Sequence, residues 1–202
     1  MNSINRVART NTDTAERTEE VERNRQEDEK KVKKVETSDA NTAKKRLMQD
    51  LKSLRASTSG DAGDTLGIYA APKDDDIFVW KAVVYGPENT VWEGGFFKLE
   101  LHFSAEYPVV PPRVKFLTKV FHPNVYVDGN ICLDTLKSNW SPTLNVEMLL
   151  LSIRSLLCDP NPLSAANGEA AQTLTTNPQA YEQKVKELVA ASLEQSISDD
   201  DA

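Results

Sequence analysis

The sequence contains few of the residues that bind metals or form disulfides. Only two cysteines and two histidines occur among its 202 residues, and the cysteines, 26 positions apart, form no CxxC pair. Neither a zinc site nor a disulfide framework is therefore expected. Thiols outside disulfides indicate a reducing compartment inside the cell, so we expect the protein in the cytoplasm, the nucleus or both.

An excess of positive charge is also absent. The 24 lysines and arginines are outnumbered by 31 acidic residues, which gives a formal net charge of -7. Binding to the nucleic-acid backbone depends on clustered basic residues, so no nucleic-acid partner is expected. The sequence has no apolar N-terminal leader and no apolar run near the roughly 20 residues that span a bilayer, which predicts a soluble protein without a membrane partner.

Composition divides the chain into three segments. Residues 1–42 contain 9 basic and 10 acidic residues and no aromatic one, so they bury too little apolar surface to offset the entropy of ordering. We interpret them as a disordered charged extension. Residues 43–195 form the predicted folded core, and residues 196–202 form an acidic tail.

The first half of the core has the patterns of one helix and four strands. From Ala43, an apolar stripe at helical spacing is formed by Leu47, Leu51 and Leu54. Between Phe97 and Phe103 apolar and polar residues alternate, which predicts a strand with one solvated face. Strands are predicted over residues 65–70, 77–85, 97–103 and 113–117, with Pro72 closing the first. Their short connections favour an antiparallel meander.

The second half of the core is predicted to be helical. Asn145 suits the N-cap of a helix over residues 146–158. Apolar residues nearly encircle this helix, so we expect it to be buried against the sheet, with Cys158 as a packing residue. Asn177 suits the N-cap of a last helix, with Pro178 at its first position. The whole pattern is that of an α+β protein.

Residues with chemical potential gather in a long turn-rich stretch, residues 121–134. A cysteine is most often a small buried hydrophobe, but the setting of Cys132 favours exposure. One interpretation is a cysteine hydrolase with His122 as base; Pro123 follows directly in the same loop, so a turn-stabilising histidine is favoured. The other is acyl transfer, with a thioester on Cys132 and an oxyanion that accepts a hydrogen bond from Asn124.

Several separated motifs resemble the catalytic core of ubiquitin-conjugating enzymes, from about Ala43 to Leu193. They are His122-Pro123-Asn124, Gly129-Asn130-Ile131-Cys132-Leu133-Asp134, Trp140-Ser141-Pro142 and Asp159-Pro160-Asn161-Pro162. The resemblance implies an N-terminal helix, a four-stranded antiparallel meander and three further helices. It also implies that Cys132 receives ubiquitin from an activating enzyme as a thioester and passes it to a substrate lysine. ATP is used by the activating enzyme, so no cofactor is expected.

The resemblance implies roles for residues around the cysteine. Asn124 would stabilise the oxyanion or order the loop that shapes the site, and the sequence leaves both roles open. Asp134 would help place the incoming lysine and lower its pKa through the local environment. Many relatives have Asp where this chain has Ser164. A neutral hydroxyl cannot supply that charge, and phosphorylation of Ser164 would restore it.

Partner surfaces follow from the same resemblance. The surface that meets the activating enzyme would include the basic residues Lys44, Lys45 and Arg46. The ligase-facing surface would include the loop 107–112 with Val109, together with Pro142 and Thr143. Some relatives that serve HECT-type ligases have Phe at the position of Val109, so a RING-type ligase is expected. The expected partners are ubiquitin, its activating enzyme, that ligase and lysine-bearing substrates, and the protein itself is expected to be a monomer.

Two other functions remain open. The first is conjugation of another ubiquitin-like modifier. Relatives dedicated to SUMO are basic and carry an insertion between cysteine and tryptophan, whereas this acidic chain runs from Cys132 to Trp140 without extra residues. The second is a non-catalytic member that only binds ubiquitin or a ligase, but such members lack the cysteine. Ubiquitin conjugation is therefore favoured.

Overall fold

The computed structural model describes residues 25, 39–59, 66–133, 136 and 139–200, with side chains up to Glu194. Contacts divide the chain into two units, Met1–Asn41 and Thr42–Ala202, and nearly all described residues belong to the second. The extension predicted for residues 1–42 lies almost entirely outside the described residues. Among the described helices, none has the length and apolar character needed to cross a membrane.

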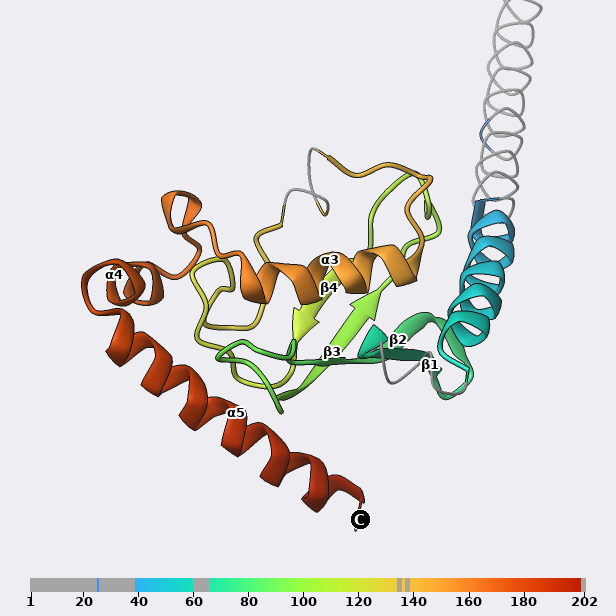
Figure 1. Ribbon diagram of the computed structural model, residues 1–202. Coiled ribbons are helices and arrows are strands. Elements are labelled where there is room, and N and C mark those ends of the chain that lie inside the picture. Colours follow the sequence, from blue (N-terminus) through green and yellow to red (C-terminus); the bar gives the residue numbers. More distant parts are fainter. Residues whose placement is uncertain (1–24, 26–38, 60–65, 134–135, 137–138, 201–202) are drawn as a thin grey trace, which may run out of the picture. The chain divides into compact units, whose positions relative to one another are not determined.

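The first helix of the core is amphipathic. Residues 39–57 are helical, drawn from blue to cyan in Figure 1. The predicted apolar stripe is confirmed, because Leu47, Leu51 and Leu54 are all buried, together with Ala43. Burying one leucine contributes about 1.5–3 kcal/mol, so packing of this stripe stabilises the helix more than intrinsic propensity does.

Four strands form one antiparallel sheet in the order β1-β2-β3-β4 (Figure 1). They are β1 (Ile68–Lys73), β2 (Asp76–Tyr85), β3 (Phe96–His102) and β4 (Arg113–Phe116). The predicted meander is confirmed. Pro72 does not close the first strand as predicted but pairs with Trp80 inside it. β1 is an edge strand, where a residue without an N–H group is tolerated.

One face of the sheet carries the hydrophobic core. In β3 the side chains of Phe97, Leu99 and Leu101 are fully buried, whereas His102 is exposed. The predicted period of two is therefore confirmed, and it sends alternate side chains to opposite faces. The helix α3 (Val146–Cys158) lies across the sheet and packs on β1 and β2 (Figure 1).

The helix α3 has the predicted bounds and the predicted cap. The Asn145 side chain accepts a hydrogen bond from the Met148 N–H at 2.8 Å. Burial is one-sided rather than encircling, and the buried residues are Val146, Leu149, Leu150, Ile153 and Leu157. Cys158 is exposed, so its interpretation as a packing residue was wrong. It follows Leu157 and so lies about 100° around the helix from that buried position.

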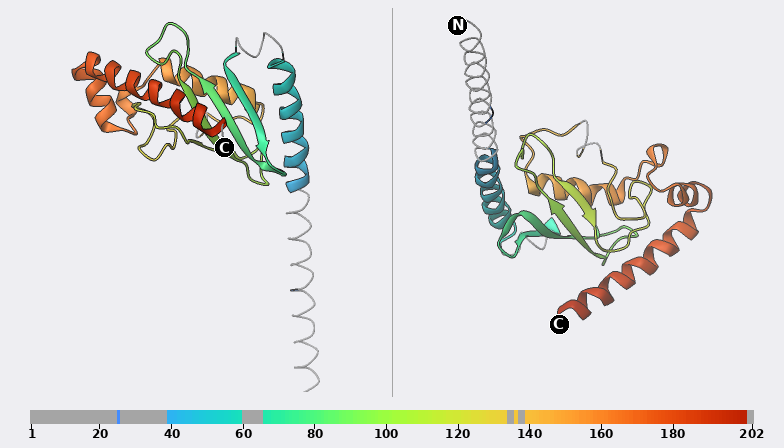
Figure 2. Two further views of the ribbon diagram at one scale, coloured as in Figure 1. Left: turned by 90° about the horizontal axis from the view of Figure 1, so that it is seen from below. Right: turned by 180° about the vertical axis from the view of Figure 1, so that it is seen from behind.

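The C-terminal part consists of η2 (Pro162–Ser164), α4 (Gly168–Thr176) and α5 (Pro178–Asp200). Figure 2 shows α5 leading away from α4 as one long helix. The predicted cap is confirmed, because the Asn177 side chain accepts from the Ala180 N–H at 3.2 Å. On α5, Ser192 joins the sheet by accepting from the Phe96 N–H at 3.0 Å. The helical backbone continues to Asp200, into the segment assigned to the acidic tail.

Candidate active site

A tight hairpin over residues 125–131 positions Cys132. Val125 pairs with Ile131 in an antiparallel bridge, and the Cys132 N–H donates to the Asn124 carbonyl at 2.8 Å. The two residues that flank the hairpin are therefore held side by side. Cys132 is half-buried rather than sealed in the core, so part of the residue is open to solvent.

The turn of this hairpin depends on a glycine. Gly129 has a φ of 91°, in the left-handed region that favours glycine. A β carbon at this position would lie 2.2 Å from the Phe116 carbonyl oxygen. Next to it, hydrogen bonds from the backbone and side-chain amides of Asn130 hold the pKa of Asp128 below its usual value. The turn is thus closed by local contacts and by close approach to β4.

The carboxamide of Asn124 ties the cysteine segment to residues 161–164. The residue is 2% exposed. Its Nδ2 donates to the carbonyls of Asn161 at 2.8 Å and Ser164 at 3.0 Å, and its Oδ1 accepts from the Asn161 N–H at 2.7 Å. These are the contacts of a loop-ordering residue. Donation to an oxyanion would require one of the two Nδ2 hydrogen bonds to be shared or released.

His122 is a structural part of the same turn. It is completely buried, with Nδ1 accepting from the Asn124 N–H at 3.0 Å and Nε2 2.9 Å from the Leu156 carbonyl. A carbonyl only accepts, so the ring proton is on Nε2. Burial lowers the pKa of His122 to about 4 despite the opposing effect of the Leu156 carbonyl. Both nitrogens are engaged and the ring is neutral at pH 7, so the interpretation as a turn-stabilising histidine is confirmed.

Residues 161–167 are attached to the turn at two places. Beyond the contacts of Asn124, the N–H groups of Ala166 and Asn167 donate to the Pro123 carbonyl at 2.8 and 2.9 Å. Ser164 is exposed on this segment, and Asn124 links it to Cys132 through two hydrogen bonds. The structure thereby brings three of the four predicted site residues into one hydrogen-bonded unit. The fourth, Asp134, lies outside the described residues.

The residues predicted to meet partners are mostly exposed. On the first helix, Lys44 and Lys45 face solvent. On the predicted ligase-facing surface, Val109 is 73% exposed, and Pro142 and Thr143 are exposed as well. These positions are therefore accessible to another protein.

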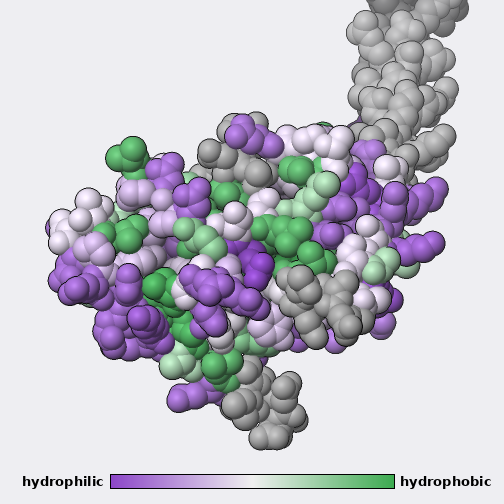
Figure 3. Space-filling view, viewed as in Figure 1, coloured by the Kyte–Doolittle hydropathy of each residue, from purple (hydrophilic) through white to green (hydrophobic). Residues whose placement is uncertain are grey.

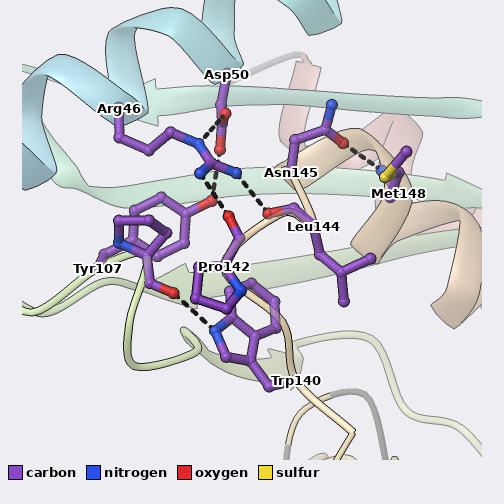
Figure 4. A network of polar contacts seen from close by, with 9 residues as sticks. Arg46, Asp50, Tyr107, Trp140, Pro142, Leu144, Asn145 and Met148 are labelled. Carbon is purple, nitrogen blue, oxygen red and sulfur yellow. Dashed lines mark hydrogen bonds and ion pairs between the residues drawn. The ribbon is translucent and has the colours of Figure 1, made fainter.

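Arg46 differs from its lysine neighbours because its guanidinium binds within the chain (Figure 4). Nε donates to Asp50 at 2.8 Å, and the two terminal nitrogens donate to the carbonyls of Pro142 at 2.6 Å and Leu144 at 2.7 Å. The guanidinium carbon also lies 5.6 Å from the centre of the Tyr107 ring. Arg46 thus joins the first helix to the segment that leads into α3.

Asp50 extends this contact to the loop that carries Val109. Asp50 is buried, and it accepts a hydrogen bond from the Tyr107 hydroxyl. Burial and that hydrogen bond raise the pKa of Tyr107 far above its usual value. Trp140 Nε1 donates to the Pro108 carbonyl at 2.8 Å. Hydrogen bonds therefore join the predicted ligase-facing loops to each other and to the first helix.

Sequence reasoning missed this network. Its only local signal is the spacing of Arg46 and Asp50, four residues apart on a helix, where opposite charges meet. The other contacts join residues far apart in the chain.

The fold and the site together define the class of the protein. The structure matches the E2 domain of a ubiquitin conjugating enzyme from Toxoplasma gondii with a TM-score of 0.65 and 35% identity, over 72% of this chain and 95% of that chain. A helix, an antiparallel four-stranded meander and three further helices are thus the fold of an E2 domain.

Sequence comparison gives the family. Residues 46–189 match the family described as ubiquitin-conjugating enzyme. Over 150 residues the chain is 51% identical to Ubiquitin-conjugating enzyme E2 3 of Arabidopsis thaliana, which covers 74% of this chain and 96% of that protein. It is 47% identical over 150 residues to Ubiquitin-conjugating enzyme E2 1 of Caenorhabditis elegans, covering 74% and 75%. The chain therefore belongs to the ubiquitin-conjugating enzyme family and is a transferase of the ubiquitin conjugation pathway.

Membership of this family also bears on partners and cofactors. Enzymes of this family interact with ubiquitin, an activating enzyme and ligases, and they generally need no cofactor.

Proposed function

We propose that Cys132 carries ubiquitin as a thioester and passes it to a lysine amine. One observation supports this most directly: the half-buried cysteine is fixed by a hydrogen bond to Asn124, whose side chain organises the neighbouring segment. The backbone around the sulfur is therefore held in place while the residue stays partly open to solvent. Such preorganisation suits a residue that exchanges acyl groups.

The reaction consists of two acyl transfers. In the first, the Cys132 thiolate attacks the thioester between ubiquitin and the activating enzyme. A new C–S bond to Cys132 forms, the C–S bond to the activating enzyme breaks, and the thiolate of the activating enzyme leaves. In the second, a lysine amine attacks, a C–N bond forms, the Cys132 thiolate leaves, and the amine loses a proton. His122 is engaged on both nitrogens and cannot take that proton. A thioester without a neighbouring imidazole base is also better protected against hydrolysis.

For Asn124 we propose a positioning role, in which it sets the geometry of the segment around Cys132. Asn124→Asp tests this role, because a carboxylate has nearly the same shape but cannot donate to the carbonyls of Asn161 and Ser164. The charging rate should fall together with the rate of lysine discharge. If Asn124 acted only on the oxyanion, the same two rates would fall, but the protection of the 161–167 amides against hydrogen exchange would stay unchanged. The positioning role therefore predicts that this protection is lost together with the two rates.

Two further residues are proposed to handle the incoming lysine. Asp134 would place the amine, and Ser164 would supply a further negative charge beside it once phosphorylated. Ser164 is exposed and therefore open to a kinase. Ser164→Glu should accelerate discharge to lysine, whereas Ser164→Ala should not. An unchanged rate in the glutamate variant would reject this role.

The proposed partners are ubiquitin, its activating enzyme, a RING-type ligase and lysine-bearing proteins, and the proposed location is cytoplasmic, nuclear or both. Exposed Lys44 and Lys45 support a contact with the activating enzyme, so a double alanine variant should raise the KM for the conjugating enzyme during charging. Exposed Val109, Pro142 and Thr143 support a contact with the ligase. We propose that the protein acts as a monomer and without a cofactor of its own.

Charging tests the central proposal. The protein is mixed with activating enzyme, ATP and ubiquitin, and a mass shift sensitive to reducing agent is expected. Cys132→Ser should give a more stable oxyester, and Cys132→Ala should give no adduct. Cys158→Ala is the matched control, because Cys158 is the second cysteine and is exposed. An adduct that persists in Cys132→Ala would overturn the assignment.

The same assay separates the two remaining alternatives. A panel of ubiquitin-like modifiers, each with its own activating enzyme, would identify a modifier other than ubiquitin. A non-catalytic binding protein would form no thioester with any of them.

A further inference from the structure

Leu163 presents an apolar side chain to solvent beside the candidate active site. It is 98% exposed, more than any other large hydrophobic residue in the part of the chain that the structure describes. In Figure 3, hydrophobic residues reach the surface in several places among hydrophilic ones. Single exposed leucines are common on protein surfaces, so exposure alone does not distinguish Leu163.

Leu163 is distinguished by how firmly its backbone is held. It lies in η2, between Pro162, whose ring restricts the backbone, and Ser164. Its N–H donates to the Asn161 side chain at 3.1 Å, and Asn124 binds the backbone of the residues on both sides. Because the backbone is already fixed, little additional backbone entropy is lost when another molecule covers the Leu163 side chain.

The support also links Leu163 to the reacting centre. Ser164, the next residue, is bound by Asn124, and Asn124 in turn accepts a hydrogen bond from Cys132. Residues 162–166 contain no charged side chain. The segment beside the cysteine is therefore rigid, uncharged and apolar at its most exposed point.

We propose that Leu163 is a specificity-determining residue that contacts an apolar side chain close to the acceptor lysine. This inference rests on the proposed roles of Cys132 and Ser164. The lysine has to reach the thioester carbonyl on Cys132, so its own chain must pass over the adjoining segment. Neighbouring residues of an extended chain are only about 3.3–3.6 Å apart, so a residue flanking the lysine can touch Leu163.

Single-turnover discharge of the wild-type ubiquitin thioester tests this inference. The acceptors are short peptides that contain one lysine. Each peptide carries one leucine, placed at one of the two positions before the lysine or one of the two positions after it. Each is compared with a peptide that has serine at the same position. At one position we expect leucine to lower the KM about tenfold, the effect of covering one leucine side chain. The rate at saturating peptide should change little, because the contact only positions the acceptor.

Leu163→Ala should abolish the preference for leucine. Its charging rate and its discharge to the amino acid lysine should equal those of the wild type. Val127→Ala is the matched control, since Val127 is 88% exposed and lies in the turn of the hairpin before Cys132. It should retain the preference.

Three results would overturn the inference. The first is a wild-type protein without a preference at any position. The second is a preference that survives in Leu163→Ala. The third is slower charging or slower discharge to the amino acid lysine in Leu163→Ala, which would place Leu163 against the ubiquitin tail. If the wild type is not charged on Cys132 at all, the proposed function fails first, and this inference fails with it.

Discussion

Replacing Arg46 by alanine is expected to destabilise the fold strongly, although the residue lies beside two lysines at the surface. The substitution removes three donated hydrogen bonds, to Asp50 and to the carbonyls of Pro142 and Leu144. It also removes the guanidinium from the Tyr107 ring. The first helix would lose its polar connection to the segment that leads into α3.

The largest part of the effect comes from Asp50. This carboxylate is 4% exposed and the Arg46 side chain is 20% exposed. Among the described residues, the variant therefore leaves a buried negative charge with only the Tyr107 hydroxyl as donor. Breaking a buried ion pair by removing one partner costs about 3–5 kcal/mol. Because Arg46 is partly solvated, we expect the lower end, about 3 kcal/mol, which for a protein of this size lowers Tm by roughly 6–12 °C.

Urea denaturation measures this loss directly. Lys45→Ala is the matched control: the residue is exposed on the same helix, and its free energy of unfolding should change by less than about 0.5 kcal/mol. Asp50→Asn provides the second comparison, because it removes the buried charge. In that background Arg46→Ala should cost at least about 1 kcal/mol less than in the wild type.

Additive costs in this cycle would refute the reasoning, since they would mean that the stranded charge of Asp50 contributes nothing. A loss below about 1 kcal/mol for Arg46→Ala alone would refute it as well.

Three further predictions concern single buried or strained positions. The pKa of His122 is lowered to about 4 in the fold, so the unfolded chain binds the proton first as the pH falls; stability is present above about pH 6.5 and declines toward pH 4, by about 2 kcal/mol between pH 7 and pH 5. His122→Gln should lose this slope in denaturation curves at the two pH values. Gly129→Ala should cost at least about 2 kcal/mol in urea denaturation, because of the positive φ and the Phe116 carbonyl; an unchanged midpoint would contradict the turn geometry. The Tyr181 hydroxyl is buried without a hydrogen-bond partner among the described residues, so Tyr181→Phe should raise the free energy of unfolding by about 1 kcal/mol, and a loss of stability would reveal a missed partner.

Elements whose cause is local could be predicted from the sequence. The bounds of α3 follow from an N-cap at Asn145 and a proline-rich stop, both adjacent to the helix they define. The meander follows from alternating residues and short connections. Each of these signals acts within a few residues, so periodicity and capping preferences are sufficient to find them.

The predictions from sequence were wrong or incomplete where contacts between residues far apart in the chain determine the structure. Pro72 is compatible with β1 only because β1 is at the edge of the sheet. Cys158 looked apolar by its sequence neighbours, but only one side of α3 faces the sheet. Arg46 has the sequence context of a surface cation, but in the structure it donates to the carbonyls of Pro142 and Leu144, nearly a hundred residues away. None of these contacts leaves a pattern in the local sequence.

The candidate active site also combines features that the sequence predicts with contacts that it does not. The motif residues around Cys132 were evident, but the hydrogen bonds of Asn124 were not, and these decide what Asn124 can do. A carboxamide that already binds two carbonyls and one N–H cannot act as an independent donor to an oxyanion. In the proposed positioning role its influence on the reaction passes through these backbone contacts with Asn161 and Ser164, so substitutions that break them should alter acceptor discharge even when the sulfur itself is untouched.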